Sequence, residues 1–288
     1  MSDIAYLNGE FMKLAEATVS VEDRGFQFGD GVYEVIRVYD MTPHLLREHI
    51  DRLKFSATSI HLDEWLSYDE WEKIVQEGIS QSGYAEAKVY IQLTRGVAPR
   101  DHRFPCTTSL TRVMTVREVE PDDLQLRKTG VSVITAQDIR WNRCDIKSLN
   151  LLPNILAKQQ AIQAGMFEAL FVREGFVFEG SSSTVMVVSN GVLYTPAEGP
   201  RILSGITRDW VLSVARASEI KVVEEPVSVE MMLDAQEVLL TGTIIEIMPV
   251  VKVDEYCIGD GKPGKIYHRL YQKFLSSISE LRYRHVCT

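Results

Sequence analysis

The sequence has few of the features that mark a disulfide-bonded, metal-binding or membrane protein. Its four cysteines, Cys106, Cys144, Cys257 and Cys287, lie far apart and form no CxxC pair, which is typical of a reduced protein without a disulfide framework. The six histidines form no HxxxH pair, and no Cys/His cluster has zinc-site spacing. No apolar run is long enough to span a membrane, and the opening residues lack the apolar core of a secretory signal. These absences predict a soluble, cytoplasmic protein without a bound metal.

The common motifs for nucleotide phosphates and for a serine nucleophile are also missing. The sequence has no Walker loop and no GxGxxG after an apolar strand pattern, and the serine run at 181–183 lacks the GxSxG frame. Lys and Arg number 31 and Asp and Glu number 40, so the formal net charge is −9. An acidic chain of this kind is not expected to bind nucleic acid or an anionic membrane.

The length of 288 residues is about twice that of a usual single domain, so two domains are expected. Hydrophobic residues make up 45% of the chain and charged residues 25%, which is a globular composition. The polar stretch 119–130 contains Pro121 and Gly130 and has no apolar periodicity, so it marks the boundary. We therefore expect a smaller N-terminal α/β domain over residues 1–120 and a larger C-terminal domain over residues 121–288.

Apolar periodicity predicts both strands and helices. Alternating β-branched and aromatic residues indicate strands at 31–39, 87–94 and 110–116. Helical spacing indicates helices over 45–60, from Ser67, over 151–165 with Gly165 as the stop, after Gly205, and from Lys265 to Ser279. Asn8-Gly9 and Glu174-Gly175 are expected to form hairpin turns. Because strands and helices do not alternate regularly, the expected fold class is α+β rather than a doubly wound sheet.

Two segments have the composition of an anion-binding site. Gly205-Ile206-Thr207 opens a helix, where free N–H groups and a hydroxyl can hold an anion, although propensity alone favours an ordinary helix start. The loop 95–105 contains cationic donors that suit a carboxylate ligand but can equally pair with surface carboxylates. These donors are Arg95, Arg100, His102 and Arg103.

Two single residues complete the list of candidates. Lys147 lies between apolar residues, where a buried amine loses its proton readily and can form a Schiff base, although most such lysines reach solvent. Glu179 closes a strand before the serines and is, taken alone, most simply a turn carboxylate. Together, an activated lysine, a carboxylate, a phosphate pocket and a carboxylate trap are the parts of a pyridoxal-phosphate site.

Six segments then identify a family. In chain order they are DRGFQFGDGVYEVIRVY, EHIDRL, TRGVAPRDHRFP, DIRWNRCDIKSLNLL, FEGSSSTV and LSGITRD. They closely resemble those of the fold-type IV pyridoxal-phosphate enzymes and, within these, the bacterial D-amino acid aminotransferases. The resemblance covers nearly the whole chain, and it implies a two-domain α+β fold with pyridoxal 5'-phosphate between the domains.

The resemblance also implies roles for residues around the cofactor. Lys147 matches the lysine that holds the cofactor as a Schiff base and then shuttles a proton between the substrate Cα and the cofactor. Glu179 matches the carboxylate that pairs with the pyridine nitrogen and keeps it protonated. The matches to phosphate-binding residues are Arg52, Ile206, Thr207 and Thr243.

For the substrate, the resemblance implies a trap for the α-carboxylate. Tyr33, Arg100 and His102 match this trap, and Ser182 and Ser183 are expected to line the site. In the family the 95–105 loop comes from the neighbouring subunit, which implies a homodimer with shared active sites. The trap presents the Cα–H bond of the D enantiomer to the lysine.

The implied reaction is D-alanine plus 2-oxoglutarate giving pyruvate plus D-glutamate. Three alternatives stay open at this point: an L-branched-chain aminotransferase, an aminodeoxychorismate lyase of the same fold, and a non-catalytic pyridoxal-phosphate or carboxylate-binding protein. The pair Arg100 and His102 argues against the first two. One segment, TGTIIE at 241–246, departs from the family pattern, because Gly242 and Ile244 supply no hydrogen-bonding side chain beside Thr243.

Overall fold

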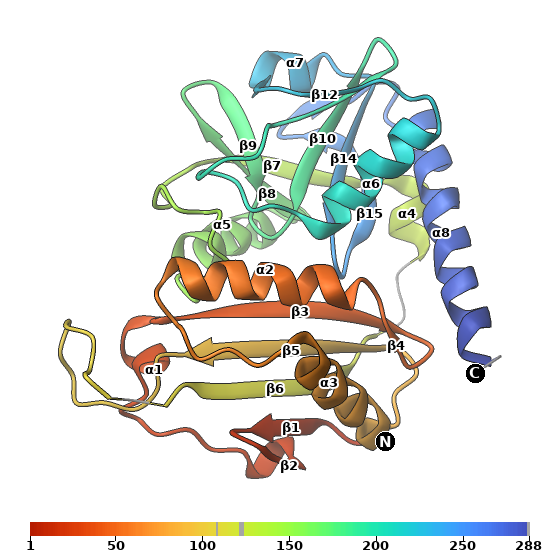
Figure 1. The fold of residues 1–288 in the computed structure, drawn as a ribbon. Coiled ribbons are helices and arrows are strands. Elements are labelled where there is room, and N and C mark those ends of the chain that lie inside the picture. Colours follow the sequence, from red (N-terminus) through yellow and green to blue (C-terminus); the bar gives the residue numbers. More distant parts are fainter. Residues whose placement is uncertain (108, 121–123, 287–288) are drawn as a thin grey trace. The chain divides into compact units, whose positions relative to one another are not determined.

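The computed structural model describes residues 1–107, 109–120 and 124–286, which form two compact units (Figure 1). Unit 1 comprises Met1–Glu120, Ile146–Asn150 and Ile278–Thr288, and unit 2 comprises Pro121–Asp145 and Leu151–Ser277. The segment that contains Lys147 therefore groups with the N-terminal part of the chain. Cys287 and part of the expected boundary stretch, residues 121–123, lie outside the described residues.

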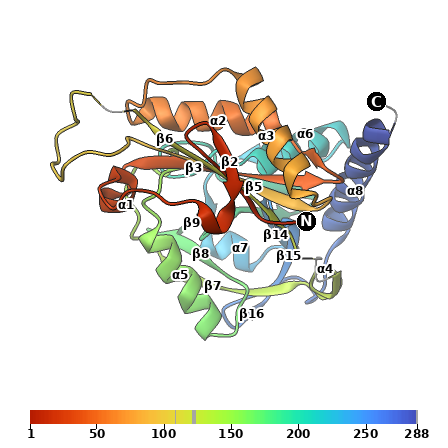
Figure 2. The same cartoon turned by 90° about the horizontal axis from the view of Figure 1, so that it is seen from below.

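Unit 1 is built on an antiparallel six-stranded sheet in the order β2-β1-β6-β5-β3-β4 (Figure 2). Its strands are β1 (Ile4–Leu7), β2 (Glu10–Lys13), β3 (Gly31–Tyr39), β4 (Thr42–Pro43), β5 (Ala87–Thr94) and β6 (Thr111–Glu118). Its helices are η1 (Leu14–Glu16), α1 (Arg24–Phe28), α2 (Leu46–Ser59) and α3 (Tyr68–Ser82). The expected strands at 31–39 and 87–94 are confirmed, and so is the hairpin turn at Asn8-Gly9 between β1 and β2.

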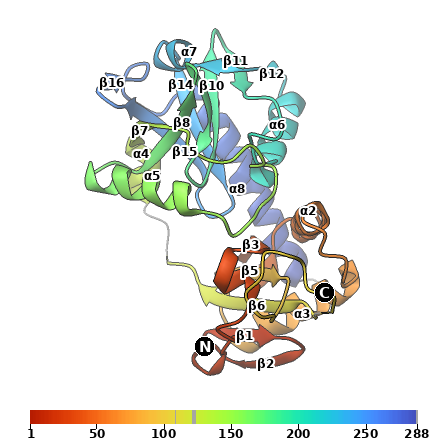
Figure 3. The same cartoon turned by 90° about the vertical axis from the view of Figure 1, so that its left-hand side faces the viewer.

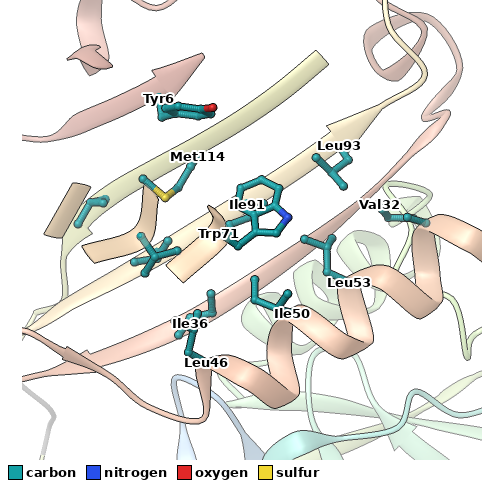
Figure 4. Close-up of a cluster of buried hydrophobic side chains, with 14 of the residues drawn as sticks. Tyr6, Val32, Ile36, Leu46, Ile50, Leu53, Trp71, Ile91, Leu93 and Met114 are labelled. Carbon is teal, nitrogen blue, oxygen red and sulfur yellow. The ribbon is translucent and has the colours of Figure 1, made fainter. Parts of the chain in front are cut away.

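The core of unit 1 lies between this sheet and the helices α2 and α3 (Figure 4). Leu46, Ile50 and Leu53 repeat along one side of α2 and are buried against the sheet. Trp71 of α3 is buried in the same cluster, 1% exposed. The expected start of α3 at Ser67 is confirmed, because Ser67 and Glu70 form a capping box.

Unit 2 contains a mixed ten-stranded sheet (Figure 3). Nine strands follow the order β12-β11-β10-β14-β15-β7-β8-β9-β13, and β16 pairs with β15. The strands are β7 (Val131–Gln137), β8 (Glu168–Arg173), β9 (Phe176–Gly180), β10 (Thr184–Ser189), β11 (Val192–Thr195), β12 (Val222–Glu224), β13 (Val227–Ser228), β14 (Glu237–Gly242), β15 (Glu246–Val253) and β16 (Tyr256–Cys257). The helices are α4 (Leu124–Thr129), α5 (Leu152–Gln163), α6 (Ile206–Ala217), α7 (Val229–Leu233) and α8 (Lys265–Val286). The α+β fold class is confirmed.

The short helices α1, α4 and α7 were not expected from the sequence, and α7 has five residues. α1 has five residues, including Gly25, and α4 has six residues in the polar stretch that was expected to be a boundary loop. None of these segments is long enough to show apolar periodicity. α8 also continues past the expected end at Ser279.

Candidate active site

The segment around Lys147 is held against β3 by main-chain hydrogen bonds. The N–H of Tyr33 donates to the Lys147 carbonyl at 3.0 Å, and the N–H of Leu149 donates to the Gly31 carbonyl at 3.0 Å. The N–H of Lys147 donates to Ser56 Oγ at 3.1 Å. The lysine side chain is half-buried, and its Nζ lies 4.5 Å from the centre of the Tyr33 ring. The chain therefore fixes the amine beside an aromatic face.

Arg52 is fixed by a buried carboxylate in unit 1. Its Nε and Nη2 donate to the two oxygens of Glu34 at 2.7 and 2.9 Å, and His49 Nδ1 lies 2.8 Å from the same carboxylate. Burial opposes ionisation of Glu34, but Arg52 and His49 outweigh it and hold the pKa of this carboxyl well below its usual range. Burial lowers the pKa of His49 more than Glu34 raises it, so the imidazole is neutral at pH 7. The guanidinium of Arg52 consequently has a rigid position.

The four basic residues of the 95–105 loop do not share one role. Arg95 is buried and pairs with Asp30, while Arg103 pairs with Asp101 on the surface. Arg100 and His102 are exposed, and both lie beside Phe28. The guanidinium carbon of Arg100 is 4.4 Å from the centre of the Phe28 ring, and the centre of the His102 imidazole is 5.6 Å from it. Arg103 thus forms a surface ion pair with Asp101, whereas Arg100 and His102 share Phe28 as an aromatic neighbour.

Glu179 lies inside β9 and not in a turn. It is 7% exposed and accepts hydrogen bonds from the Arg140 guanidinium and from the N–H of Leu203, the latter at 3.1 Å. Arg140 is itself paired bidentately with Asp138, at 2.9 and 3.0 Å. The interpretation of Glu179 as a simple turn carboxylate is therefore wrong. Unit 2 holds a fixed, buried chain of three charged groups.

The start of α6 has free main-chain N–H groups, and a threonine hydroxyl lies beside it. Its N-cap is Gly205, and no side chain caps the first N–H groups. A Cβ on Gly205 would lie 2.7 Å from Thr184 Oγ1, and Thr184 is the cross-strand partner of Thr241. Among the residues that the structure describes, the buried hydroxyls of Ser183 and Thr241 have no hydrogen-bond partner. Such orphaned donors need a ligand or water.

The remaining predicted residues of unit 2 lie in loops. The N–H and Oγ of Ser182 donate to the buried carboxylate of Glu168 at 2.7 and 3.1 Å. Thr243 is half-buried in the turn between β14 and β15. Gly242 ends β14 opposite Glu246, and Ile244 is 37% exposed.

The predicted site residues are thus divided between the units. Tyr33, Arg52, Arg100, His102 and Lys147 belong to unit 1. Glu179, Ser182, Ser183, Ile206, Thr207 and Thr243 belong to unit 2.

The family model described as amino-transferase class IV matches residues 31–253. This range covers more than half of the chain and includes β3, Lys147, Glu179 and the start of α6. The chain belongs to the class IV aminotransferase family.

Curated relatives in this family match almost the whole chain. The D-alanine aminotransferase of Bacillus licheniformis is 41% identical over 276 residues, which cover 94% of this chain and 95% of the relative. That of Listeria monocytogenes serotype 1/2a (strain 10403S) is also 41% identical, over 95% of both chains.

Among the solved structures that this chain resembles are branched-chain amino acid aminotransferases. The T.th. enzyme with pyridoxamine 5'-phosphate has a TM-score of 0.90 at 27% identity and covers 98% of this chain and 95% of its own. The Escherichia coli enzyme has a TM-score of 0.89 at 27% identity and covers 96% and 94%.

Sequence reasoning missed several charged partners in this class IV aminotransferase. Asp138 and Arg140 stand in the same motif as Lys147, DIRWNRCDIKSLNLL, and Glu34 directly follows Tyr33. The one sign of these partners in the sequence was the presence of charged residues between apolar ones. Their partners are 39 residues away for Arg140 and 18 for Glu34, so no local pattern could identify them.

Within residues 1–107, 109–120 and 124–286, no helix is long and apolar enough to cross a membrane. No three His, Cys, Asp or Glu side chains in that part of the chain are placed to hold a metal ion.

Proposed function

We propose that this chain is a pyridoxal 5'-phosphate-dependent D-amino acid aminotransferase. The reaction is D-alanine plus 2-oxoglutarate giving pyruvate plus D-glutamate, in a ping-pong cycle. The observation that carries the proposal is the 41% identity to curated D-alanine aminotransferases over 94% of the chain. The segment PRDH, with Arg100 and His102, supports D-amino acids over the L-branched-chain substrates of the relatives with solved structures.

The residues present fit the cofactor chemically. A phosphate requires N–H and hydroxyl donors, and the uncapped start of α6 with Ile206 and Thr207 offers both. The unpartnered buried hydroxyls of Ser183 and Thr241, as far as the described residues show, are further donors in the same unit. Arg52 and Thr243 complete the proposed set of phosphate donors. A protonated pyridine nitrogen requires a fixed anion, and Glu179 is one.

Bound pyridoxal 5'-phosphate supplies an electrophilic aldehyde and a ring that accepts electrons from the substrate Cα. Lys147 is the residue that binds this aldehyde at rest and moves the proton at the substrate Cα, because its amine is held in one place beside Tyr33. Glu179 holds a proton at the ring nitrogen by charge and hydrogen bonding. Arg140 and Leu203 orient the carboxylate for this task.

The substrate carboxylate is bound by Tyr33, Arg100 and His102. Guanidinium and imidazole donors form short, charge-assisted hydrogen bonds with carboxylates, which orients the substrate as well as binding it. With its carboxylate held by these three residues, the D enantiomer presents its Cα–H bond to Lys147. We assign Ser182 and Ser183 to the substrate site as well, and Glu168 fixes Ser182.

We further propose a cytoplasmic homodimer in which the 95–105 loop completes the partner's site. Support comes from α5, which exposes four apolar side chains: Leu152, Ile155, Leu156 and Ile162, each more than half exposed. Apolar patches of this kind on a single chain are typical of subunit interfaces. We assign residues 1–120 to the smaller domain and residues 121–288 to the larger, cofactor-binding domain.

A coupled assay tests the proposal directly. Purified protein is supplied with pyridoxal 5'-phosphate and 2-oxoglutarate, and pyruvate formation from D-alanine and from L-alanine is compared. We expect turnover of D-alanine only. Preferred turnover of L-leucine would instead support the branched-chain alternative, pyruvate release from aminodeoxychorismate would support the lyase, and cofactor binding without turnover would indicate a binding protein.

A further inference from the structure

Two buried arginines of unit 1 share a single carboxylate. Arg24 and Arg95 are 3% and 6% exposed, and both pair with Asp30. Arg24 Nε donates to Asp30 Oδ2 at 2.8 Å, and Arg95 Nε and Nη2 donate to the same carboxylate at 2.9 and 3.0 Å. Burial opposes ionisation of Asp30, but the two arginines outweigh it, so the pKa of this carboxyl lies below its ordinary value. The cluster has a net charge of +1.

Arg24 connects this cluster to the loop that contains Arg100 and His102. Its main-chain N–H donates to the Gly96 carbonyl at 2.9 Å. Its Nη1 donates to the Asp101 carbonyl at 2.6 Å and to the Arg103 carbonyl at 3.3 Å. One residue therefore bonds both ends of the stretch 96–103, on either side of Arg100 and next to His102.

The other end of α1 contacts the two proposed substrate-binding side chains themselves. The Phe28 ring lies 4.4 Å from the guanidinium carbon of Arg100 and 4.9 Å from that of Arg24. The rings of Phe28 and His102 are 5.6 Å apart, and Arg100 Nη1 donates to the Gln27 carbonyl at 3.2 Å. A guanidinium over an aromatic face is held by the charge distribution of the ring. Phe28 is thus a common support for Arg100 and His102.

Apart from these contacts, the loop is held by a hydrogen bond from the Ala98 N–H to the Glu22 carbonyl at 3.2 Å and by the Phe104 ring, whose centre lies 3.7 Å from the Arg95 guanidinium carbon. Residues 99–104 are exposed, and no strand or helix includes them. Buried arginines in a low-dielectric interior, in contrast, are rigid only while their carboxylate partner is present. The order of an exposed loop with few apolar contacts therefore depends on Arg24 and Asp30.

We propose that Arg24, Asp30 and Phe28 are positioning residues for substrate specificity: they hold Arg100 and His102 in the arrangement that binds the substrate α-carboxylate. The proposal rests on the function proposed above for Arg100 and His102. It assigns a role to the DRGFQFGD segment, none of whose residues contacts the reacting atoms in that proposed function. Arg24 and Phe28 act on the loop, and Asp30 acts through Arg24.

The test uses the holoenzyme and the variant Arg24→Lys. Lysine keeps the charge, but one ammonium cannot bond a carboxylate and two carbonyls in a fixed plane. The matched control is Arg37→Lys, because Arg37 also pairs with a carboxylate, Glu86, and donates to two main-chain carbonyls, away from the loop. Hydrogen–deuterium exchange of the 96–105 amides, KM, kcat and the cofactor absorption spectrum are measured for each protein.

We expect Arg24→Lys to increase exchange in 96–105 and to raise KM for D-alanine and 2-oxoglutarate by about tenfold or more, with kcat within about twofold and an unchanged spectrum. Arg37→Lys should change none of these. Unchanged exchange would overturn the anchoring, and faster exchange with unchanged KM would overturn its link to substrate. A merely structural role would lower stability without separating KM from kcat.

A second variant keeps the proposal testable if Arg24→Lys does not fold. Phe28→Leu leaves every ion pair in place and removes only the ring beside Arg100 and His102, so KM should again rise by about tenfold. An unchanged KM in this variant contradicts the support role of Phe28. If the wild-type enzyme transaminates no D-amino acid, the proposed function fails, whereas the anchoring is still decided by the exchange measurement alone.

Discussion

The guanidinium of Arg140 bonds the carboxylate of Glu179 while the same guanidinium forms a bidentate pair with Asp138. The arrangement has a clear electrostatic consequence. Arg140 alone would neutralise Glu179, but Asp138 pairs with Arg140 and, at 3.4 Å, also with the more exposed Arg173, so Asp138 offsets part of the charge of Arg140. The pairing also raises the pKa of Arg140 against the effect of burial, so the guanidinium stays charged. Glu179 can then act as an anion towards a protonated ring nitrogen.

The charge of Glu179 should be required for the chemical step. Gln is nearly isosteric but carries no negative charge, so Glu179→Gln should lower kcat by about one to two decades, the loss expected for one charged hydrogen bond. Cofactor should remain bound, as judged by absorbance after gel filtration. The control is Glu174→Gln, which removes an exposed carboxylate in the preceding turn. A normal kcat in cofactor-saturated Glu179→Gln would remove Glu179 from the catalytic set.

Asp138 should affect the rate through Arg140. In Asp138→Asn the charge of Arg140 is no longer compensated, so Glu179 is neutralised and we expect kcat to fall by about tenfold with little change in KM. A matched control is Asp145→Asn in the same motif, because Asp145 pairs with Arg143 at the surface. Equal kcat values in the two variants would show that the compensation has no effect on catalysis.

Lys147 should be the only lysine that carries the cofactor covalently. Borohydride reduction followed by peptide mapping is expected to place the pyridoxyl group on Lys147. Lys147→Ala should bind cofactor noncovalently and lose nearly all transamination, because the proton-transferring amine is absent. Lys158→Ala is a suitable control, since Lys158 is also half-buried with its Nζ 4.8 Å from an aromatic ring centre. Labelling of another lysine would refute the assignment.

Arg100 tests the substrate trap and the shared site together. Arg100→Ala should raise KM for D-amino acids and 2-oxo acids by about one to two decades, because a charged hydrogen bond to the carboxylate is lost. If the loop completes the partner's site, mixing inactive Arg100→Ala with inactive Lys147→Ala should restore part of the activity. Each mixed dimer then has one site with neither change. Absence of recovery despite proven subunit exchange would contradict the shared-site dimer.

His44 should contribute to the acid sensitivity of the fold. Burial, together with repulsion from His49 once that imidazole is protonated in acid, lowers the pKa of His44 from 6.5 to about 4. The unfolded chain therefore binds a proton at a higher pH than the folded chain does, so stability is lost as pH falls from 6.5 towards 4. Each unit of difference corresponds to about 1.4 kcal/mol, so the whole effect is at most a few kcal/mol.

The matching experiment compares thermal unfolding midpoints of wild type and His44→Asn at about pH 7, above the window in which the two states bind protons differently, and at about pH 4.5, near its lower end. The variant should lose less stability between these pH values than the wild type. His268→Asn, which changes an exposed histidine of α8, should follow the wild-type profile. Parallel profiles for wild type and His44→Asn would mean that His44 does not titrate differently in the two states.

The sequence alone was sufficient for the local elements and for the family. The strand at 31–39, the capped start at Ser67 and the positive-φ stop at Gly165 follow from alternation, side-chain hydrogen bonding and glycine geometry, which act within a few residues. The ordered motifs likewise identified the family, because motif spacing is a property of the chain itself. The short helices α1, α4 and α7 were missed because five or six residues cannot establish a helical period.

Only the tertiary structure decided which charged residues act together. Glu34 lies on the buried face of β3 between Val32 and Ile36, where Arg52 and His49 of α2 satisfy it. Arg140 bonds the carboxylate of Glu179 across 39 positions of the chain, and Arg24 bonds the main-chain carbonyl of Asp101 across 77. Burial makes an unpaired charge costly, so such partners are dictated by the packing of distant elements and not by any local pattern.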